Sequence, residues 1–340
     1  MNSIRSRTEQ IERETLAPYA SLSAESRGRA VEEQPDSVRT CFQRDRDRIL
    51  HSKSFRRLMH KTQVFIRPEQ DHYRTRLTHT LEVAQISRTV ARALRLNEDL
   101  TEAIALGHDV GHTPFGHAGE HALDEAVRSL RPNSGFKHYE QSVRVLQQLE
   151  RDGQGLNLCV ETIEGVAGHS KGRTDIGEFD PSETPSLEAA VVRLCDRIAY
   201  LNHDLDDAVR AGWMSLEALP KDFQDLGASH SQRISAMVSD IIETSASRPA
   251  VEFSAVMARR LNSMKEYLFE NVYLTYSKEV PDVKKAQHVV TSLFRYYVEH
   301  EDSMPEAYTG FQGAIDYLSG MTDRFAIRQY EALFVPSAWA

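Results

Sequence analysis

The chain has 340 residues, of which 40% are hydrophobic and 27% are charged, and its formal net charge is −9. These values are typical of a water-soluble protein of one or two domains, and the negative charge argues against nucleic acid as an obligatory partner. We expect a cytoplasmic protein without a membrane partner, since no run of about 18 apolar residues and no signal-peptide core is present, and the three cysteines form no CxxC pair.

Residues 1–60 are predicted to form an N-terminal basic helical segment that packs on the core. After a polar stretch at 20–38, this region carries a run of positive charge that only Asp45 and Asp47 oppose. The run can be a polyphosphate clamp, a groove for single-stranded nucleic acid, or a solvated helix face with internal ion pairs. For most of its residues taken singly we favour the ion pairs. The run consists of Arg39, Arg44, Arg46, Arg48, Lys53, Arg56, Arg57 and Lys61.

Helical periodicity recurs through the rest of the chain. Asn97 is a predicted N-cap for a helix that ends at Gly107. Further helical patterns cover 79–95, 139–149, 187–211, 232–246, 250–274, 282–299 and 309–318, with breaks at 131–137 and in a long loop at 168–186. Neither alternating strand patterns nor an internal repeat is found. We therefore predict an all-α protein with a core at 61–230 and a C-terminal helical region at 231–340 that belongs to the same globule.

The run GHDVGHTPFGHAGE, residues 107–120, places three histidines and two carboxylates among glycines. Histidine with Asp or Glu is the ligand mix expected for Mg, Mn, Fe or Zn. His108 and Asp109 point about 100° apart on a helix, yet both can reach one ion over the helix end. The alternative is a polar loop with histidines in ordinary hydrogen bonds, but the density of ligands favours a metal site.

Two residues on other predicted helices are candidates to complete this site. His79 lies near the start of the 79–95 helix, 29 residues before His108, which leaves room for a helix and a turn to bring them together. Asp196 lies in a mostly apolar helix, where a lone buried carboxylate is costly unless it is paired or bound to metal. Each residue alone is better explained structurally, but the combination favours a shared site.

The order His, then His-Asp, then a distant Asp resembles the HD-domain metal-dependent phosphohydrolases, and within them the bacterial deoxyguanosinetriphosphate triphosphohydrolase-like proteins. The resemblance covers most of 7–210 and implies an all-α HD-domain helical bundle with additional C-terminal helices. It also implies cleavage of a deoxynucleoside triphosphate at the α-phosphorus, which gives a deoxynucleoside and tripolyphosphate. Its most specific stretches are LAPYA (16–20), SRGR (26–29), RTCFQRDRDR (39–48), FRRL (55–58), KTQVF (61–65), residues 107–120 and DRIAY (196–200).

The resemblance assigns metal-binding and catalytic residues. The ligands of a divalent cation, which would be Mg, Mn or another transition metal, would be His79, His108, Asp109 and Asp196. His117 and Glu120 fall on the catalytic pair, and a histidine beside a carboxylate suits a group that orients water or protonates a departing oxygen. His112 and His138 match positions that face the phosphates, with a surface helix position as the alternative for His138.

The resemblance also implies a substrate site. Arg76, one turn before His79, is placed to reach the α-phosphate, with a surface ion pair as the alternative. Tyr200, Asp204 and Gln63 match residues that contact the sugar and discriminate against a 2′-hydroxyl. Asp207 lies on the same helix as Asp204, and for Asp207 we favour a solvent-facing position.

Other functions remain open at this point. The chain could be an HD phosphohydrolase for another nucleotide, or a module that senses a nucleotide effector or single-stranded nucleic acid. Retention of all four ligands together with His117 and Glu120 argues against a site without catalysis. A homo-oligomer is expected because the resembled family commonly forms one.

Overall fold

A computed structural model of the protein describes residues 3–64, 74–169 and 185–336. Within these ranges the chain is built from helices, and two isolated bridges, Arg29 with Cys159 and Thr62 with Thr75, are the only strand-like pairings. The all-α prediction is confirmed. None of the helices in these ranges has the length and apolarity to span a membrane. Most of the loop predicted at 168–186 lies outside the described residues.

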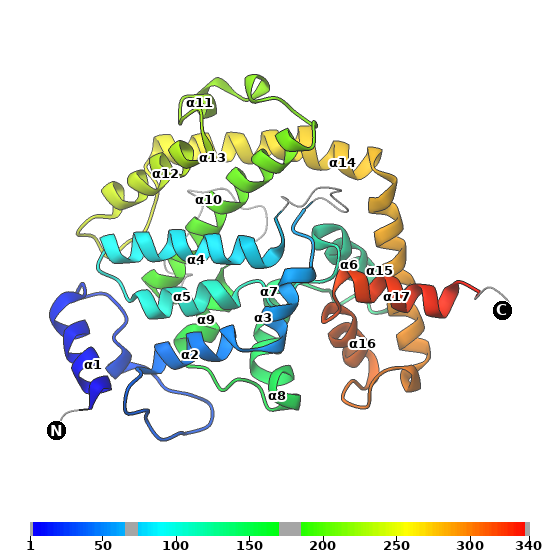
Figure 1. Ribbon diagram of the computed structural model, residues 1–340, viewed down its shortest axis with the longest axis horizontal. Coiled ribbons are helices and arrows are strands. Elements are labelled where there is room, and N and C mark those ends of the chain that lie inside the picture. Colours follow the sequence, from blue (N-terminus) through cyan, green and yellow to red (C-terminus); the bar gives the residue numbers. More distant parts are fainter. Residues whose placement is uncertain (1–2, 65–73, 170–184, 337–340) are drawn as a thin grey trace.

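A long segment joins the first two helices, and the first and last helices lie on opposite sides of the molecule (Figure 1). The N-terminal helices are α1 (Ile4–Thr15), α2 (Cys41–Leu50) and α3 (Lys53–Arg57). The central helices are α4 (Arg76–Ala93), α5 (Glu98–Gly107), α6 (Gly116–Leu130), α7 (His138–Arg144), α8 (Glu150–Gly153), α9 (Val160–Gly168) and α10 (Leu187–Arg210). The C-terminal helices are α11 (Lys221–Gln224), α12 (His230–Ser245), α13 (Ala255–Leu268), α14 (Leu274–Glu279), α15 (Pro281–Glu299), α16 (Gly310–Ser319) and α17 (Asp323–Phe334).

Two of the helical runs contain a wider, π-helical turn. Residues Val145–Leu149 continue α7, and residues Phe269–Tyr273 join α13 to α14. The continuous helix predicted at 250–274 therefore starts only at Ala255 and changes its winding before it ends. Such π turns are often found at functional sites, and Tyr273 at the end of the second one belongs to the site described below.

Side-chain caps fix where the central helices begin. Asn97 accepts a hydrogen bond from the backbone of Leu100, which starts α5 where the sequence predicts it. Thr75 caps α4, and Ser186 caps α10. A side-chain cap stabilises a helix by about 1 kcal/mol. Because α4 begins at Arg76, this arginine lies in the first turn of the helix that carries His79.

The buried side chains form two hydrophobic clusters. The larger one lies between α2, α4, α5, α9 and α10 and continues into α12 and α13, with Phe42 and Ile49 of α2 fully buried in it. The smaller one joins α6 to α15, α16 and α17, which are neighbours in Figure 1. Helices α5 and α6 therefore belong to different clusters, and residues 108–115 between them cross from one to the other. The predicted division of the chain into an N-terminal segment (1–60), a core (61–230) and a C-terminal region (231–340) stays a prediction.

Candidate metal centre

Three of the four predicted ligands meet where α4, α5 and α10 pack together. His79 Nε2 lies 3.0 Å from Asp196 Oδ1, and His108 Nε2 lies 3.9 Å from the same oxygen. One ligand atom from each of these residues lies within 4.8 Å of those of the other two. His79 stands near the start of α4, His108 caps the end of α5, and Asp196 lies in the middle of α10.

Asp109, the fourth predicted ligand, lies beside these three. Its Oδ1 is 3.8 Å from His108 Nε2, and its Oδ2 is 2.5 Å from Nη1 of Arg76. Burial would raise the pKa of Asp109, but nearby positive charge, first of all that of Arg76, outweighs burial and holds the pKa well below its usual range. Arg76 is only 1% exposed, so the alternative of a surface ion pair is wrong: the pair is buried. The contact of Arg76 with an α-phosphate stays a prediction.

The donor atoms fit a divalent cation. His108 Nδ1 lies 2.6 Å from the carbonyl oxygen of Ala105, which places the proton on Nδ1 and leaves the lone pair on Nε2. This buried Nε2 has no hydrogen-bond partner in the described part of the chain, which is costly unless a ligand completes the site. Imidazole nitrogen and carboxylate oxygen are suitable ligands for Mn, Fe or Zn. We conclude that His79, His108 and Asp196, with Asp109 adjacent, can hold such an ion.

A second cluster is centred on Glu120, in the first turns of α6. Its carboxylate lies 2.7 Å from His138 Nδ1, 3.4 Å from His112 Nε2 and 3.3 Å from His117 Nδ1. Burial would raise the pKa of Glu120, but the charge of His138 and the hydrogen bonds from His117 and His138 outweigh it and hold this pKa well below its usual range. The ring of His138 stacks on that of His112, with centroids 4.6 Å apart. His138 therefore belongs to the cluster, and the surface alternative for it is wrong.

Glycines in the 107–120 run permit close backbone contacts that bring the two clusters together. A Cβ atom on Gly111 would lie 2.1 Å from the backbone nitrogen of Ser142 in α7. Gly116 has a φ of +58°, and a Cβ atom there would lie 2.6 Å from the carbonyl oxygen of Gln63. Only glycine fits both demands at little cost. The glycines thus let α7 approach closely enough to place His138 over His112.

His169, at the end of α9, is a residue of the site that the sequence analysis missed. Its ring lies 5.0 Å from that of His108, and its Nε2 lies 3.3 Å from His138 Nε2. It thus bridges the two clusters. Burial lowers the pKa of His169 to about 3, so the residue is neutral at physiological pH. Its position at the boundary of the predicted 168–186 loop was the only signal in the sequence.

The predicted sugar-binding residues lie further along α10. Asp204 is 1% exposed and accepts a hydrogen bond from the hydroxyl of Tyr273. The ring of Tyr200 stacks on that of Tyr273, with centroids 6.2 Å apart. Burial raises the pKa of Asp204 to about 7. Gln63 is also buried, and its Oε1 has no hydrogen-bond partner within the described residues. This oxygen can therefore accept a hydrogen bond from a ligand.

Asp207 does not face solvent as we expected. It is 5% exposed, and its Oδ1 lies 3.2 Å from Nη1 of Arg74. The prediction was wrong because α10 packs against α4 along this face, and Arg74, just before α4, supplies a charge that offsets the burial of the carboxylate.

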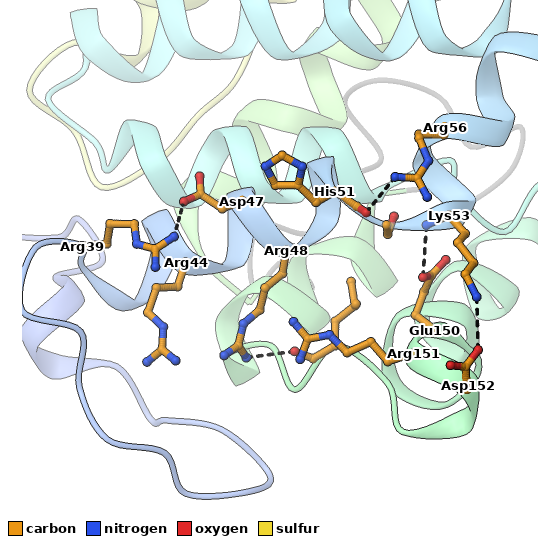
Figure 2. A pocket seen from close by; sticks show the side chains of 12 residues that line it. Arg39, Arg44, Asp47, Arg48, His51, Lys53, Arg56, Glu150, Arg151 and Asp152 are labelled. Carbon is orange, nitrogen blue, oxygen red and sulfur yellow. Dashed lines mark hydrogen bonds and ion pairs between the residues drawn. The ribbon is translucent and has the colours of Figure 1, made fainter.

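Five of the eight residues of the basic run line a separate cavity of about 500 Å³ between α2, α3 and α8 (Figure 2). None of the residues around it belongs to the histidine clusters. Arg39 pairs with Asp36 and Asp47, and Arg44 and Arg48 both pair with Glu33. Internal ion pairs, the interpretation that we favoured for most of these residues, thus account for much of the run. Lys61 differs: it is buried and donates to the carbonyl oxygens of His112 and Ser319.

Comparisons with known proteins agree with this geometry. The HD domain family matches residues 76–201, and the phosphohydrolase-associated domain family matches residues 251–332. A deoxyguanosinetriphosphate triphosphohydrolase-like protein from Caldanaerobacter subterraneus is 51% identical over 99% of this chain and 97% of its own length. Proteins of the same description from Desulfatibacillum aliphaticivorans and Clostridium tetani are 45% and 44% identical, each over 98% of this chain and at least 97% of their own lengths.

Proposed function

Because the chain belongs to the deoxyguanosinetriphosphate triphosphohydrolase-like family of HD-domain phosphohydrolases, we propose that it hydrolyses deoxynucleoside triphosphates to deoxynucleoside and tripolyphosphate. The observation that carries the proposal is the union of two clusters: the metal-ligand set of His79, His108 and Asp196, and the histidines around Glu120. The two parts complement each other in phosphate hydrolysis, since a metal ion activates and holds the phosphate and a histidine–carboxylate cluster handles a proton.

A divalent cation would be held by His79, His108, Asp109 and Asp196. When bound, it would supply a Lewis acid that lowers the pKa of water and neutralises oxygens of the α-phosphate. The protein itself holds its ligands rigidly, because the packed faces of α4 and α10 fix His79 and Asp196 and the end of α5 fixes His108. Such positioning is the main contribution of a protein to phosphoryl transfer.

The cluster around Glu120 would manage the proton that the leaving 5′-oxygen requires. His117 is the member of this cluster that reaches the surface, with 58% of its side chain exposed, and we assign it the transfer of that proton. Glu120 Oε2 lies 3.3 Å from His117 Nδ1, and because the pKa of Glu120 is held well below its usual range, its ionised carboxylate can orient this imidazole. His138, whose pKa is raised by Glu120 against the effect of burial, adds positive charge on the phosphate side.

The sugar would lie against Tyr200, with Asp204 and Gln63 as its polar contacts. Two observations support this placement: the buried oxygen of Gln63 without a partner and the buried carboxyl of Asp204 that contacts Tyr273. A buried polar group that is built to bind a hydroxyl rejects analogues that leave it unpaired. Preference for a deoxyribose would arise from the packed aromatic pair of Tyr200 and Tyr273, which leaves little room for a 2′-hydroxyl.

A panel of deoxynucleoside and ribonucleoside triphosphates, each with Mn²⁺ and with Mg²⁺, tests the proposal. Deoxynucleoside triphosphates, dGTP among them, should be hydrolysed and ribonucleotides should be poor substrates. Hydrolysis of monophosphates or of an alarmone instead would favour another HD phosphohydrolase. If wild-type protein binds nucleotides but turns none over, it is a sensing module.

We also propose that the cavity of Figure 2 binds an anionic effector such as a second nucleotide. Six cationic side chains line it, against three carboxylates. Arg56 and Arg151 have no carboxylate partner in the described ranges, so their charge is available. The double variant Arg56→Ala/Arg151→Ala should reduce any change in dGTP hydrolysis that a second nucleotide causes. An effect of the same size in the variant would contradict an effector site here.

A further inference from the structure

Behind His79, on the side away from Asp196, the structure contains a second histidine and a carboxylate. His203 Nδ1 lies 3.2 Å from His79 Nδ1, and Glu82 Oε2 lies 2.9 Å from His203 Nε2. His203 is fully buried. It follows Asp196 by seven residues, or two turns on the same face of α10, and Glu82 follows His79 by three residues on α4. Helices α4 and α10, which supply the ligands His79 and Asp196, thus each also supply one residue of this second layer.

If His79 binds the cation, the contacts among His79, His203 and Glu82 allow one arrangement of their protons. His79 Nε2 faces Asp196, so it must carry a lone pair if it is to bind the cation. The proton of His79 then sits on Nδ1 and is donated to His203 Nδ1, since two nitrogens 3.2 Å apart share one proton. The remaining proton of His203 sits on Nε2, which lies 2.9 Å from Glu82 Oε2, although the N–H is not aligned with that oxygen as a hydrogen bond.

The surroundings of Glu82 keep its carboxylate ionised and in place. Burial would raise the pKa of Glu82, but His203 and Arg74 outweigh it and lower the pKa to about 2. Arg74 also fixes the carboxylate directly, with its Nε 3.1 Å from Glu82 Oε2. The series of contacts that starts at His79 and passes through His203 therefore ends on the carboxylate of Glu82, which Arg74 holds in place.

We propose that His203 and Glu82 are positioning residues for the metal centre, which hold His79 in the tautomer and orientation that present Nε2 to the cation. This inference rests on the proposed metal-dependent function, since it requires His79 to be a ligand. Histidine ligands usually donate their second N–H to a carboxylate or carbonyl group, and loss of that partner typically weakens metal binding about 10- to 100-fold. Here a second imidazole stands between the ligand and the carboxylate.

The test measures Mn²⁺ binding by calorimetry in full-length variants, because a merely structural residue would change stability without changing metal affinity. His203→Leu should weaken Mn²⁺ binding about 10- to 100-fold, since it leaves His79 Nδ1 buried without an acceptor. His203→Gln should restore most of the affinity, because its amide can accept from His79 and donate to Glu82. Glu82→Leu should weaken binding more than Glu82→Gln, which retains an acceptor.

His230 provides a matched control. Its ring stacks on that of His203, with centroids 5.8 Å apart, and it makes no contact with His79 among the described interactions. His230→Leu should keep wild-type Mn²⁺ affinity. If His203→Leu also binds Mn²⁺ as tightly as wild type, the positioning role is refuted while the metal centre stands. If wild-type protein binds no Mn²⁺, the metal-dependent function fails first and the positioning role falls with it.

Discussion

Arg76 offers a test of whether the predicted substrate contact or the buried ion pair explains this residue. Arg76→Met removes the guanidinium but keeps most of the apolar volume, and it leaves the carboxylate of Asp109 buried without its partner. Loss of one member of a buried ion pair costs roughly 3–5 kcal/mol. At about 2 °C of melting temperature per kcal/mol, the metal-free variant should melt roughly 6–10 °C below wild type.

Two further measurements identify the cause of this loss. In the double variant Arg76→Met/Asp109→Asn no uncompensated charge remains, so most of the lost stability should return. Added Mn²⁺ should stabilise Arg76→Met more than wild type, because a cation beside Asp109 replaces the missing positive charge. Both effects can be followed by thermal unfolding with a chelator or with Mn²⁺.

Arg88 is the matched control, since it lies on the same helix with 42% of its side chain exposed and pairs only loosely with Glu98 and Glu102. Arg88→Met should cost less than about 1 kcal/mol. If metal-free Arg76→Met is as stable as Arg88→Met, the buried pair does not stabilise the fold. In that case, a loss of activity in Arg76→Met would support the predicted phosphate contact instead.

Three further predictions concern the ligand set and the sugar site. Asp109→Ala should lose bound metal and hydrolysis while it keeps its helicity; a metal content equal to wild type by elemental analysis would refute Asp109 as a ligand. Tyr200→Ala should reduce the preference of kcat/KM for deoxynucleotides over ribonucleotides by about 10-fold, or ~1.4 kcal/mol, with metal content unchanged; an equal loss for both substrates would make Tyr200 a packing residue. Asp204 has a folded pKa of about 7, raised by burial, so its protonated form stabilises the fold at about pH 4 and this contribution is lost as the pH rises to about 7. The stability advantage of wild type over Asp204→Asn in chemical denaturation should decrease over that range, and a constant difference would contradict the shift.

The sequence predicted those elements whose signals are local. Asn97 at the start of α5 and the apolar periodicity of α10 needed no tertiary information, and both helices lie where we expected. By contrast, α6 was not predicted as a helix, because its first turn contains two glycines, Gly116 and Gly119, which have low helix propensity. Its stability comes from packing against α15 and α16, which is not visible in the sequence.

The same distinction applies to the site. His79, His108 and Asp196 were found because an imidazole–carboxylate set in this order has few other uses, and the structure brings these three together. His169 and His203 were missed because each depends on which helix faces pack together, and a lone histidine in a helical pattern carries no such information. Asp207 was misplaced for the same reason, since its partner Arg74 lies 133 residues away in the sequence.

The central claim, that this HD site releases an intact triphosphate, is tested most directly by phosphorus NMR of a reaction with dGTP and Mn²⁺. The account predicts tripolyphosphate as the first phosphorus product, in a one-to-one ratio with deoxyguanosine. It also predicts that Asp109→Ala forms neither. Orthophosphate or pyrophosphate as the initial product would mean attack at a different phosphorus atom and would contradict the proposed placement of the α-phosphate over His79, His108 and Asp196.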